Sequence, residues 1–363
     1  MPWVIWLHPR KEGIMRCEVI VDLQFGSTGK GAVAAYLANR RHFDASLRVQ
    51  SIQAGHTVYY KGKPYKMRTI PCAWVDPSCI LILGPGAFIE KELLLEEIRM
   101  VTEATGEDVC DRLYLDSRAT YILPEDFQVE KDAQIEGKIG STAHGAGASL
   151  VRKIMRASTP TRVIDDHWAM DQGLLMCDSI LMTKGMDVLV EGCQGTMLSV
   201  HTSPYYPFVT SRECTVAGII SECGIAPRDV AEVHGVFRTF PIRVGGNSGP
   251  TGGRELSWAD VSERAGRDVA PERTTVTNKV RRIFEFSDED FEHALRVNGP
   301  DLLYMTFADY LGPGIYGKRS MGALGMESAN AIIRYVDRIN ERHHCRVNWI
   351  GTGEKAEDYI VLA

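Results

Sequence analysis

Five segments, four of which contain glycine, combine hydroxyl, amide and basic side chains, the residue types that bind phosphate groups. The first, QFGSTGKG at 24–31, follows an apolar run and precedes a helix-like segment. A lysine and free backbone N–H groups at a helix N-terminus form an anion site. The segment does not fit the P-loop pattern, because its glycines are too close together and Gly31 stands where a magnesium-binding hydroxyl is required. It therefore predicts a phosphate site of another kind, built on Lys30.

The other four segments extend this candidate site. They are QAGHT (53–57), GSTAHGAG (140–147), EGCQGTMLSVHTSPYYPFVTS (191–211) and TTVTNKVRR (274–282). Each could be an ordinary loop. Five of them with polar side chains, at the predicted ends of strands, indicate a ligand site instead, because α/β sheets bind ligands at the carboxyl ends of their strands. His56 could donate a hydrogen bond or a proton to a phosphate, and a buried structural histidine is the alternative.

Apolar segments predict the strands that would position these loops. Most are continuous apolar runs, typical of strands covered on both faces. The predicted strands are 17–24, 46–53, 79–84, 112–116, 187–192, 234–244, 302–307 and 345–351. Helices fall between them, the clearest at 328–344, with an apolar stripe of Ala329, Ile332, Ile333, Val336 and Ile339. The fold class is therefore α/β: a single large domain with a central, mostly parallel sheet, flanking helices and inserted ligand-binding loops.

Composition excludes several classes of protein. The 363 residues are 44% hydrophobic and 24% charged, and the net charge of −6 gives no general basic field for nucleic acid. Nine cysteines without a C-x-x-C pair predict reduced thiols and a cytoplasmic protein. No apolar run is long enough to span a bilayer, so no membrane partner is expected, and no signal peptide is evident. Residues 1–14 are expected to be an extension outside the fold, and 15–363 the domain.

Together the motifs resemble the adenylosuccinate synthetase family. The first loop of that family reads QWGDEGKGK, and this sequence has QFGSTGKGA from residue 24. The family segments NAGHT, EGAQGTLLD, YPYVTS and RVGxG correspond to QAGHT, EGCQGTMLS, YPFVTS and RVGGN. Each match alone is weak, but the ordered set is specific. The resemblance runs from about residue 17 to the C-terminus.

The resemblance implies a C–N ligase. A nucleoside triphosphate phosphorylates O6 of a 6-oxopurine nucleotide, and the amine of L-aspartate then displaces that phosphate. The implied catalytic residues are Ser27, Lys30, His56 and Gln194. The acceptor nucleotide would bind Ser27, Gln53, Ser141, Thr142, Arg156, Gln194, Thr210, Val244 and Gly245. The donor would bind Thr28, Gly29, Lys30, Gly31, His56, Thr57, Phe307, Asp309, Gly351, Thr352 and Gly353.

Three further implications concern aspartate, metal and assembly. Thr277, Lys279 and Arg281 would bind L-aspartate, although Lys279 stands where the family has arginine and lacks its bidentate fork. Ser27 and the Gly55 carbonyl would hold Mg²⁺. Arg156 would reach the active site of the neighbouring subunit in a homodimer. Replacing Lys30 or His56 with alanine is expected to abolish product formation with little change in the thermal midpoint.

The main departure from the family is Ser27, where the family has an aspartate that serves as base for the purine N1 proton and as magnesium ligand. Serine leaves room beside N1, and its hydroxyl can accept a hydrogen bond from a 2-amino group. Guanine carries that group and hypoxanthine does not. The change is typical of a phage branch, the 2-aminoadenylosuccinate synthetases. We therefore expect dGMP as acceptor, N6-succino-2-amino-2'-deoxyadenylate for 2,6-diaminopurine DNA as product, and the host cytoplasm as location if the chain is phage-encoded.

The second departure lies in the donor site. The family reads guanine with TKLD, and this sequence has TFAD at 306–309, so that Asp309 remains and Phe307 replaces lysine. Phenylalanine stacks on either purine, and ATP or dATP is therefore expected as donor. Two alternatives stay open: an ordinary adenylosuccinate synthetase that uses IMP, and an inactive nucleotide-binding homologue. Retention of Lys30, His56 and Gln194 argues against the second alternative.

Overall fold

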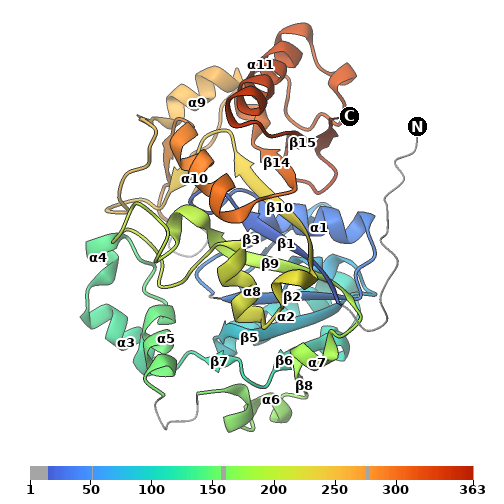
Figure 1. The fold of residues 1–363 in the computed structure, drawn as a ribbon, viewed down its shortest axis with the longest axis vertical. Coiled ribbons are helices and arrows are strands. Elements are labelled where there is room, and N and C mark those ends of the chain that lie inside the picture. Colours follow the sequence, from blue (N-terminus) through green and yellow to red (C-terminus); the bar gives the residue numbers. More distant parts are fainter. Residues whose placement is uncertain (1–14, 51, 157–160, 275–277, 363) are drawn as a thin grey trace.

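A computed structural model describes residues 15–50, 52–156, 161–274 and 278–362. Its main feature is an 11-stranded sheet in the order β16-β15-β14-β10-β1-β9-β2-β5-β6-β8, with β7 paired to β5 (Figure 1). All neighbours are parallel except β15 and β16, which are antiparallel. The α/β class predicted from the sequence is confirmed.

The strands of this sheet agree closely with the apolar segments of the sequence. They are β1 Arg16–Asp22, β2 Ala45–Gln50, β5 Ile80–Ile89, β6 Leu113–Asp116, β7 Thr120–Tyr121, β8 Leu175–Cys177, β9 Asp187–Gly195, β10 Val230–Arg238, β14 Leu302–Thr306, β15 Val347–Gly351 and β16 Tyr359–Val361. One prediction was wrong in extent, because 234–244 is two strands. β10 ends at Arg238, and the chain turns before Ile242, where Pro241 lacks the N–H that a central strand needs.

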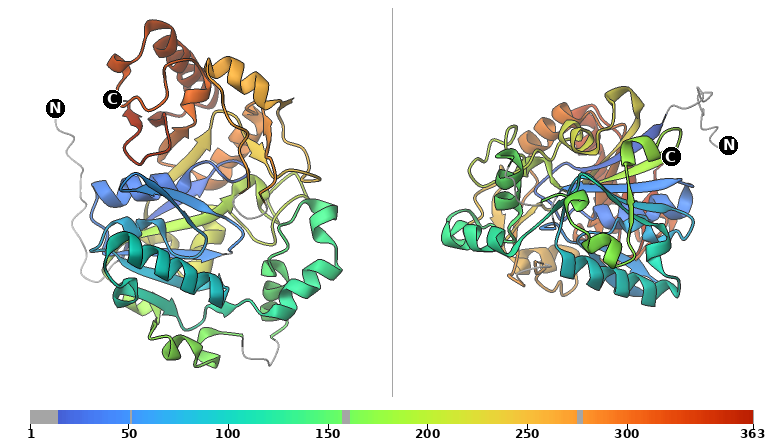
Figure 2. Two further views of the ribbon diagram at one scale, coloured as in Figure 1. Left: turned by 180° about the vertical axis from the view of Figure 1, so that it is seen from behind. Right: turned by 90° about the horizontal axis from the view of Figure 1, so that it is seen from below.

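Helices cover both faces of the sheet. One face carries α1 Lys30–Arg40 and α2 Lys91–Thr105, and the other carries α8 Val216–Cys223, α10 Asp288–Asn298 and α11 Met326–His343 (Figures 1 and 2). In β1, Ile20 packs toward the α1 and α2 side, and Val19 and Val21 toward the other. Burial on both faces is why these strands are continuously apolar.

The apolar stripe predicted for α11 is mostly confirmed. Ile332, Val336 and Ile339 are buried in the core. Ile333 was assigned wrongly, because 45% of it is exposed. It lies one position beyond the face that contacts the sheet, and residues adjacent in sequence on a helix point about 100° apart.

Smaller elements surround the sheet. They are the hairpin β3 His56–Tyr60 and β4 Lys63–Met67; a three-stranded sheet of β11 Ile242–Arg243, β13 Arg282–Phe284 and β12 Glu255–Leu256; and the helices α3 Pro124–Asp132, α4 Ile135–Ile139, α5 Ala146–Ile154, α6 Trp168–Asp171, α7 Ser179–Met182 and α9 Trp258–Ala265. α3, α4 and α5 project together from one side of the sheet (Figure 1). Within the described ranges, no helix has the length and apolarity needed to cross a membrane.

The topology brings the predicted loops together. Six neighbouring parallel strands, β15, β14, β10, β1, β9 and β2, end at the same edge of the sheet. The segments that follow them contain most of the predicted site residues. Crevices at this edge are where α/β sheets bind ligands, so the fold itself places the candidate site there.

Candidate active site

Asp22 organises the glycine-rich loop that follows β1. Its carboxylate is fully buried and accepts hydrogen bonds from the backbone N–H of Gln24 at 2.7 Å and Gly26 at 3.4 Å. It also accepts from Thr28 Oγ1 at 2.6 Å and from Lys30 Nζ at 3.0 Å. A single carboxylate therefore fixes the shape of the loop and holds its ammonium group. Asp22 was not among the predicted site residues, although an acidic residue that ends an apolar strand is a signal that could have identified it.

Lys30 starts α1 and is only 3% exposed. Besides Asp22, its ammonium donates to the carbonyl of Gln194 at 3.0 Å, so it joins the ends of β1 and β9. Gly31 must be small, because a Cβ there would lie 2.9 Å from both His56 Cβ and the Thr57 carbonyl oxygen. The first two predicted loops are thus in direct contact. The ion pair bears on the expectation that replacing Lys30 would barely change the thermal midpoint. Removing this lysine would leave the buried Asp22 carboxylate without its cation, so we now expect a loss of stability as well.

His56 begins β3 and is buried. Its Nδ1 bonds to the carboxylate of Glu191, and its Nε2 lies 3.0 Å from the Cys193 carbonyl. Burial and the nearby Arg48 guanidinium lower the pKa of His56, whereas Glu191 opposes that change. Contact with a phosphate requires the ring to leave at least one of these partners.

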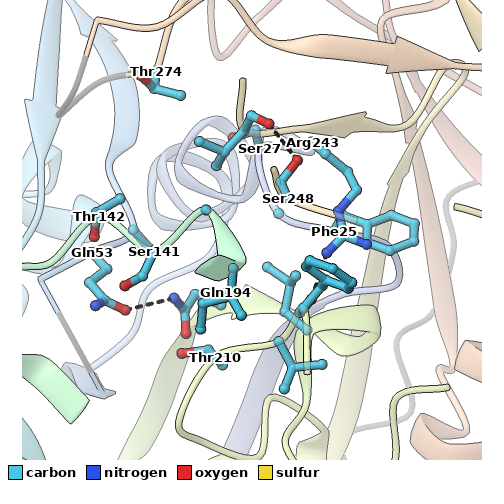
Figure 3. Close-up of a pocket in the computed structure, with 18 of the residues that line it drawn as sticks. Phe25, Ser27, Gln53, Ser141, Thr142, Gln194, Thr210, Arg243, Ser248 and Thr274 are labelled. Carbon is cyan, nitrogen blue, oxygen red and sulfur yellow. Dashed lines mark hydrogen bonds between the residues drawn. The ribbon is translucent and has the colours of Figure 1, made fainter. Parts of the chain in front are cut away.

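A cavity of about 220 Å³ lies at the carboxyl edge of the sheet. Ten predicted residues line it: Ser27, Gln53, Gly55, His56, Ser141, Thr142, Gln194, Thr210, Val244 and Arg281. Figure 3 shows Gln53, Ser141, Thr142, Gln194 and Thr210 together on one side of it, and Phe25 and Arg243 on the other. All five predicted loops and the 242–248 segment contribute to the wall.

Two hydroxyl groups in this cavity lack a protein partner. Thr142 Oγ1 and Thr210 Oγ1 are both buried, and neither forms a hydrogen bond within the described chain. A buried unpaired hydroxyl is costly, and a bound phosphate would accept a hydrogen bond from each. The loop that carries Thr142 is held by Glu130, whose carboxylate accepts from the N–H groups of Gly145 at 2.8 Å and Gly147 at 2.6 Å. Glu130, like Asp22, was not among the predicted site residues.

Gln194 and Gln53 form an amide pair within the cavity. Gln194 Nε2 donates to Gln53 Oε1 at 3.3 Å (Figure 3). The Cys214 thiol lies 3.8 Å from Gln194 Oε1. The ends of β9 and β2 carry these two amides, because the two strands are direct neighbours. Together they present donors and acceptors, as recognition of a purine edge requires.

Ser27 lines the cavity in a left-handed backbone conformation, with φ +55°. Its carbonyl accepts from Nη1 of Arg238 at 3.1 Å. Arg238 is fully buried, pairs with Glu272, and places its guanidinium 3.8 Å from the Phe307 ring. One buried arginine, absent from our sequence prediction, thus links the predicted acceptor residue Ser27 to the predicted donor residue Phe307.

Another missed arginine, Arg243, closes the opposite wall. Its guanidinium donates to the Pro250 carbonyl at 2.5 Å and the Phe208 carbonyl at 2.6 Å, and it lies 4.7 Å from the centre of the Phe25 ring. Burial lowers the pKa of Arg243 to about 10. The sequence signal was its place in RVGGN, of which we had named only Val244 and Gly245.

The predicted aspartate-binding loop is divided between the cavity and its rim. Arg281 lines the cavity, and its Nε donates to the Arg273 carbonyl at 3.2 Å. Lys279 is at the surface and pairs with Glu136 of α4 at 2.6 Å. Gly245 packs directly on this loop, where a Cβ would collide with the Val280 carbonyl. Thr277 lies outside the described residues.

The predicted donor-base residues lie beside the glycine-rich loop 24–31, which is called the phosphate loop below. Thr306 Oγ1, at the end of β14, donates to the Thr28 carbonyl at 2.7 Å, and a Cβ on Gly29 would lie 3.5 Å from Thr306 Cγ2. Phe307 follows in a left-handed conformation, and Asp309 is buried. Gly351 of β15 also contacts Thr306, since a Cβ there would lie 3.4 Å from it. A nucleotide with phosphates on Lys30 could therefore extend toward these residues.

The remaining donor residues have structural partners. Thr352 is buried, with Oγ1 donating to the Lys318 carbonyl at 2.5 Å, and Gly353 packs against Asp358. Thr57 pairs with Lys66 in the hairpin.

Arg156, predicted to bind the acceptor in a neighbouring subunit, lies just after the exposed end of α5, outside the cavity of its own chain.

The oxygen groups available for a metal are few. Ser27 and Gly55 line the cavity, and both can offer neutral oxygen ligands. The carboxylates of Asp22 and Glu130 are already occupied by N–H and ammonium groups. This donor set fits Mg²⁺ if phosphate oxygens and water supply most ligands, which is how Mg²⁺ is commonly bound.

Comparison with known proteins identifies the family. A sequence model described as "Adenylosuccinate synthetase" matches residues 19–171 and 166–313. The chain belongs to the adenylosuccinate synthetase family. Members of this family are C–N ligases, so the predicted family and enzyme class are confirmed.

Both branches of the adenylosuccinate synthetase family are similar to the chain. N6-succino-2-amino-2'-deoxyadenylate synthase of Vibrio phage phiVC8 is 34% identical over 308 residues, covering 82% of this chain and 87% of the phage protein. Adenylosuccinate synthetase of Methanocaldococcus jannaschii is 30% identical over 356 residues, covering 97% and 99%. A solved structure, the succinoaminodeoxyadenylate synthetase (PurZ) of cyanophage S-2L bound to dGMP and dATP as an energy donor, is 31% identical, with a TM-score of 0.79 and coverage of 96% and 95%.

Proposed function

We propose that this ligase joins L-aspartate to C6 of dGMP, with ATP or dATP as phosphoryl donor, and forms N6-succino-2-amino-2'-deoxyadenylate. The observation that carries the proposal is Ser27 in the cavity wall. A short neutral side chain there leaves space for the 2-amino group of guanine and offers a hydroxyl acceptor to it. The similarity to phage synthases of the same named product supports this choice.

The acceptor would span the cavity. Its 5′-phosphate would take the unpaired hydroxyls of Thr142 and Thr210, and its base would lie between Gln194 and Ser27. In this placement the phosphate accepts hydrogen bonds from the two unpaired threonine hydroxyls, and the purine O6 lies toward the end of β9. Lys30 contacts the Gln194 carbonyl, so its ammonium lies at the same end.

The chemistry would proceed in two displacements. O6 of dGMP attacks the γ-phosphorus of the donor as N1 releases its proton to water, and the nucleoside diphosphate leaves. The amine of L-aspartate then attacks C6 of the 6-phosphoryl purine, phosphate leaves, and the new C–N bond forms with loss of an amine proton. Lys30 and the N-terminus of α1 would stabilise the negative charge of the transferring group. His56 would donate to the donor phosphates after its ring leaves Cys193 or Glu191. Arg281 would bind a carboxylate of L-aspartate.

Magnesium has a limited set of protein ligands in this proposal. The adenylosuccinate synthetases generally depend on Mg²⁺. Ser27 and the Gly55 carbonyl would contact it from the cavity wall, and it would neutralise phosphate charge when bound. With no free carboxylate in this part of the wall, we expect Mg²⁺ to bind together with the donor nucleotide.

A homodimer would complete the acceptor site. The exposed side of α5 and the residue that follows the helix carry Val151, Ile154 and Met155, which are 61%, 63% and 74% exposed, directly before Arg156. Three adjacent exposed apolar side chains are typical of an interaction surface. A second copy that covers them would carry Arg156 toward a cavity other than its own.

The test compares dGMP and IMP as acceptors with ATP, Mg²⁺ and L-aspartate, using mass spectrometry of the product. We expect faster turnover of dGMP. Ser27→Asp should reverse that preference by crowding the 2-amino group, and its backbone should tolerate the change because aspartate adopts the left-handed conformation more readily than most residues. Ser27→Ala, which removes the hydroxyl without adding bulk, is the matched control and should keep the preference for dGMP.

The second candidate function is synthesis of adenylosuccinate from IMP, which the similarity to the archaeal synthetase favours. A wild-type protein that turned over IMP faster than dGMP would decide for this candidate. A protein that bound both nucleotides without product, in the presence of every substrate, would instead be an inactive homologue.

A further inference from the structure

The environment of Asp309 bears on the choice of donor base, and this inference rests on the function proposed above. Asp309 lies in the short helical turn Ala308–Tyr310, next to β14, and is 5% exposed. Its Oδ2 accepts a hydrogen bond from Nη2 of Arg267. The carboxylate that could read N–H groups of a base is therefore already engaged by a protein cation.

The position of Arg267 is fixed by its surroundings. It follows Gly266, which ends α9 in a left-handed conformation with φ +61°. Pro313 packs behind Gly266, where a Cβ would lie 2.7 Å from the Cβ of Pro313. The guanidinium of Arg267 also lies 4.9 Å from the ring centre of Tyr316, whose hydroxyl donates to Glu354. Arg267 thus links the end of α9 to two residues of the segment that follows β14, and Tyr316 extends the contact to Glu354 after β15.

This bridge lies where the donor base would reach. Thr306, three residues before Asp309, bonds to the phosphate loop at Thr28, and Gly351 of β15 packs on Thr306. A chain of directly contacting residues therefore connects the phosphate loop to the end of β14, which precedes Asp309. Asp309 and Arg267 together present an acceptor and a donor at this end of the site.

The two donor purines differ in what they offer to such a pair. Guanine presents hydrogens at N1 and at the 2-amino group, which need a free carboxylate such as that of Asp309. Adenine presents an unprotonated N1, which needs a donor, and a 6-amino group, which needs an acceptor. An arginine has N–H donors only, so it matches adenine N1 and opposes the protonated N1 of guanine.

We propose that Arg267 is a specificity-determining residue that makes the donor site prefer adenine over guanine nucleotides. It occupies the Asp309 carboxylate that guanine would need, and its remaining N–H groups can donate to the acceptor that adenine carries at N1. Phe307, with its ring against Arg238, supplies a stacking surface that suits either purine. The selection against guanine is thus assigned to the ion pair and not to the aromatic ring.

The experiment measures kcat/KM for ATP and for GTP with saturating dGMP and L-aspartate at pH 8, in wild type, Arg267→Ala and Arg267→Ala/Asp309→Ala. We expect the ATP-to-GTP ratio to fall at least about tenfold in Arg267→Ala, mainly through KM, because a hydrogen bond to a charged group contributes that much. The double variant should lose the gain for GTP, since the freed carboxylate is gone.

Arg264→Ala is the matched control. Arg264 lies on the same helix and its removal changes the charge equally, but it pairs with Glu285 at 3.5 Å and not with Asp309. It should leave the ratio within about twofold of wild type. Arg267→Gln, which keeps the bulk of the side chain, replaces Arg267→Ala if the alanine variant does not fold, and the same direction of change is expected.

Two kinds of failure can be told apart. A wild-type protein that prefers GTP, in turnover or in calorimetric binding of non-hydrolysable analogues, overturns the proposed donor and this inference with it. A wild-type preference for ATP that survives removal of Arg267, or that falls equally in Arg264→Ala, overturns the role of Arg267 alone.

Discussion

Replacing Lys30 with methionine should destabilise the protein as well as inactivate it. Lys30 and Asp22 form a buried ion pair at 3.0 Å, with side-chain exposures of 2% and 0%. Removing one partner of such a pair leaves an uncompensated charge, at a cost of about 3–5 kcal/mol. Asp22 would keep its bonds from Thr28 Oγ1 and two backbone N–H groups. We therefore expect a loss near the lower end, about 3 kcal/mol.

A double-mutant cycle separates stability from catalysis. Asp22→Asn/Lys30→Met removes both charges, so it should recover about 2 kcal/mol relative to Lys30→Met. Turnover should not recover, because the cation that stabilises the transferring phosphoryl group is still missing; a donor of this kind contributes about 2.7–4 kcal/mol, or roughly a hundred- to thousand-fold in rate. The free energy of unfolding is measured by urea denaturation, and turnover by release of nucleoside diphosphate.

Lys91→Met is the control for loss of a lysine ion pair. Lys91 pairs with Asp166 at side-chain exposures of 25% and 35%, so its loss should cost about 1 kcal/mol or less. The reasoning is refuted if Lys30→Met is as stable as Lys91→Met, or if the double variant is no more stable than Lys30→Met. Restored turnover in the double variant would show that Lys30 acts on the fold and not on the phosphate.

Three further predictions follow from the site and its surroundings. Burial raises the pKa of Asp309 from 3.8 to about 6, with Arg267 opposing the rise. The folded protein therefore binds this proton more tightly, and the free energy of unfolding of wild type relative to Asp309→Asn should fall by about 2 kcal/mol between pH 4 and pH 7. A difference that grows with pH would contradict the burial argument. Arg281→Lys should raise KM for L-aspartate about tenfold or more, through loss of the bidentate fork, and KM for both nucleotides less than twofold; equal increases would place Arg281 elsewhere. Met155→Glu should shift a dimer toward monomer in light scattering, because it charges a side chain that is 74% exposed on the apolar face of α5, and an unchanged mass would exclude that face as the interface.

The loops that build the cavity could be predicted from the sequence because their signals are local. Continuous apolar runs gave the strands, since both faces of the sheet are covered. Glycine and hydroxyl residues after those strands then marked the edge of the sheet that lines the cavity. Ser27, Gln194, Thr142 and Thr210 lie in these segments and were named individually by resemblance to the family, and the structure brings all four to one wall or another of the same cavity.

The partners of the charged residues could not be predicted, because they come from distant parts of the chain. Glu191 lies 135 residues from His56, and Glu272 lies 34 residues from Arg238. Arg267 and Asp309, separated by 42 residues, meet only because α9 ends beside the turn that follows β14. Sequence patterns indicate which residues can bind a nucleotide. The packing of helices and loops against the sheet decides which of those charges are already neutralised, because burial makes an unpaired charge too costly to leave alone.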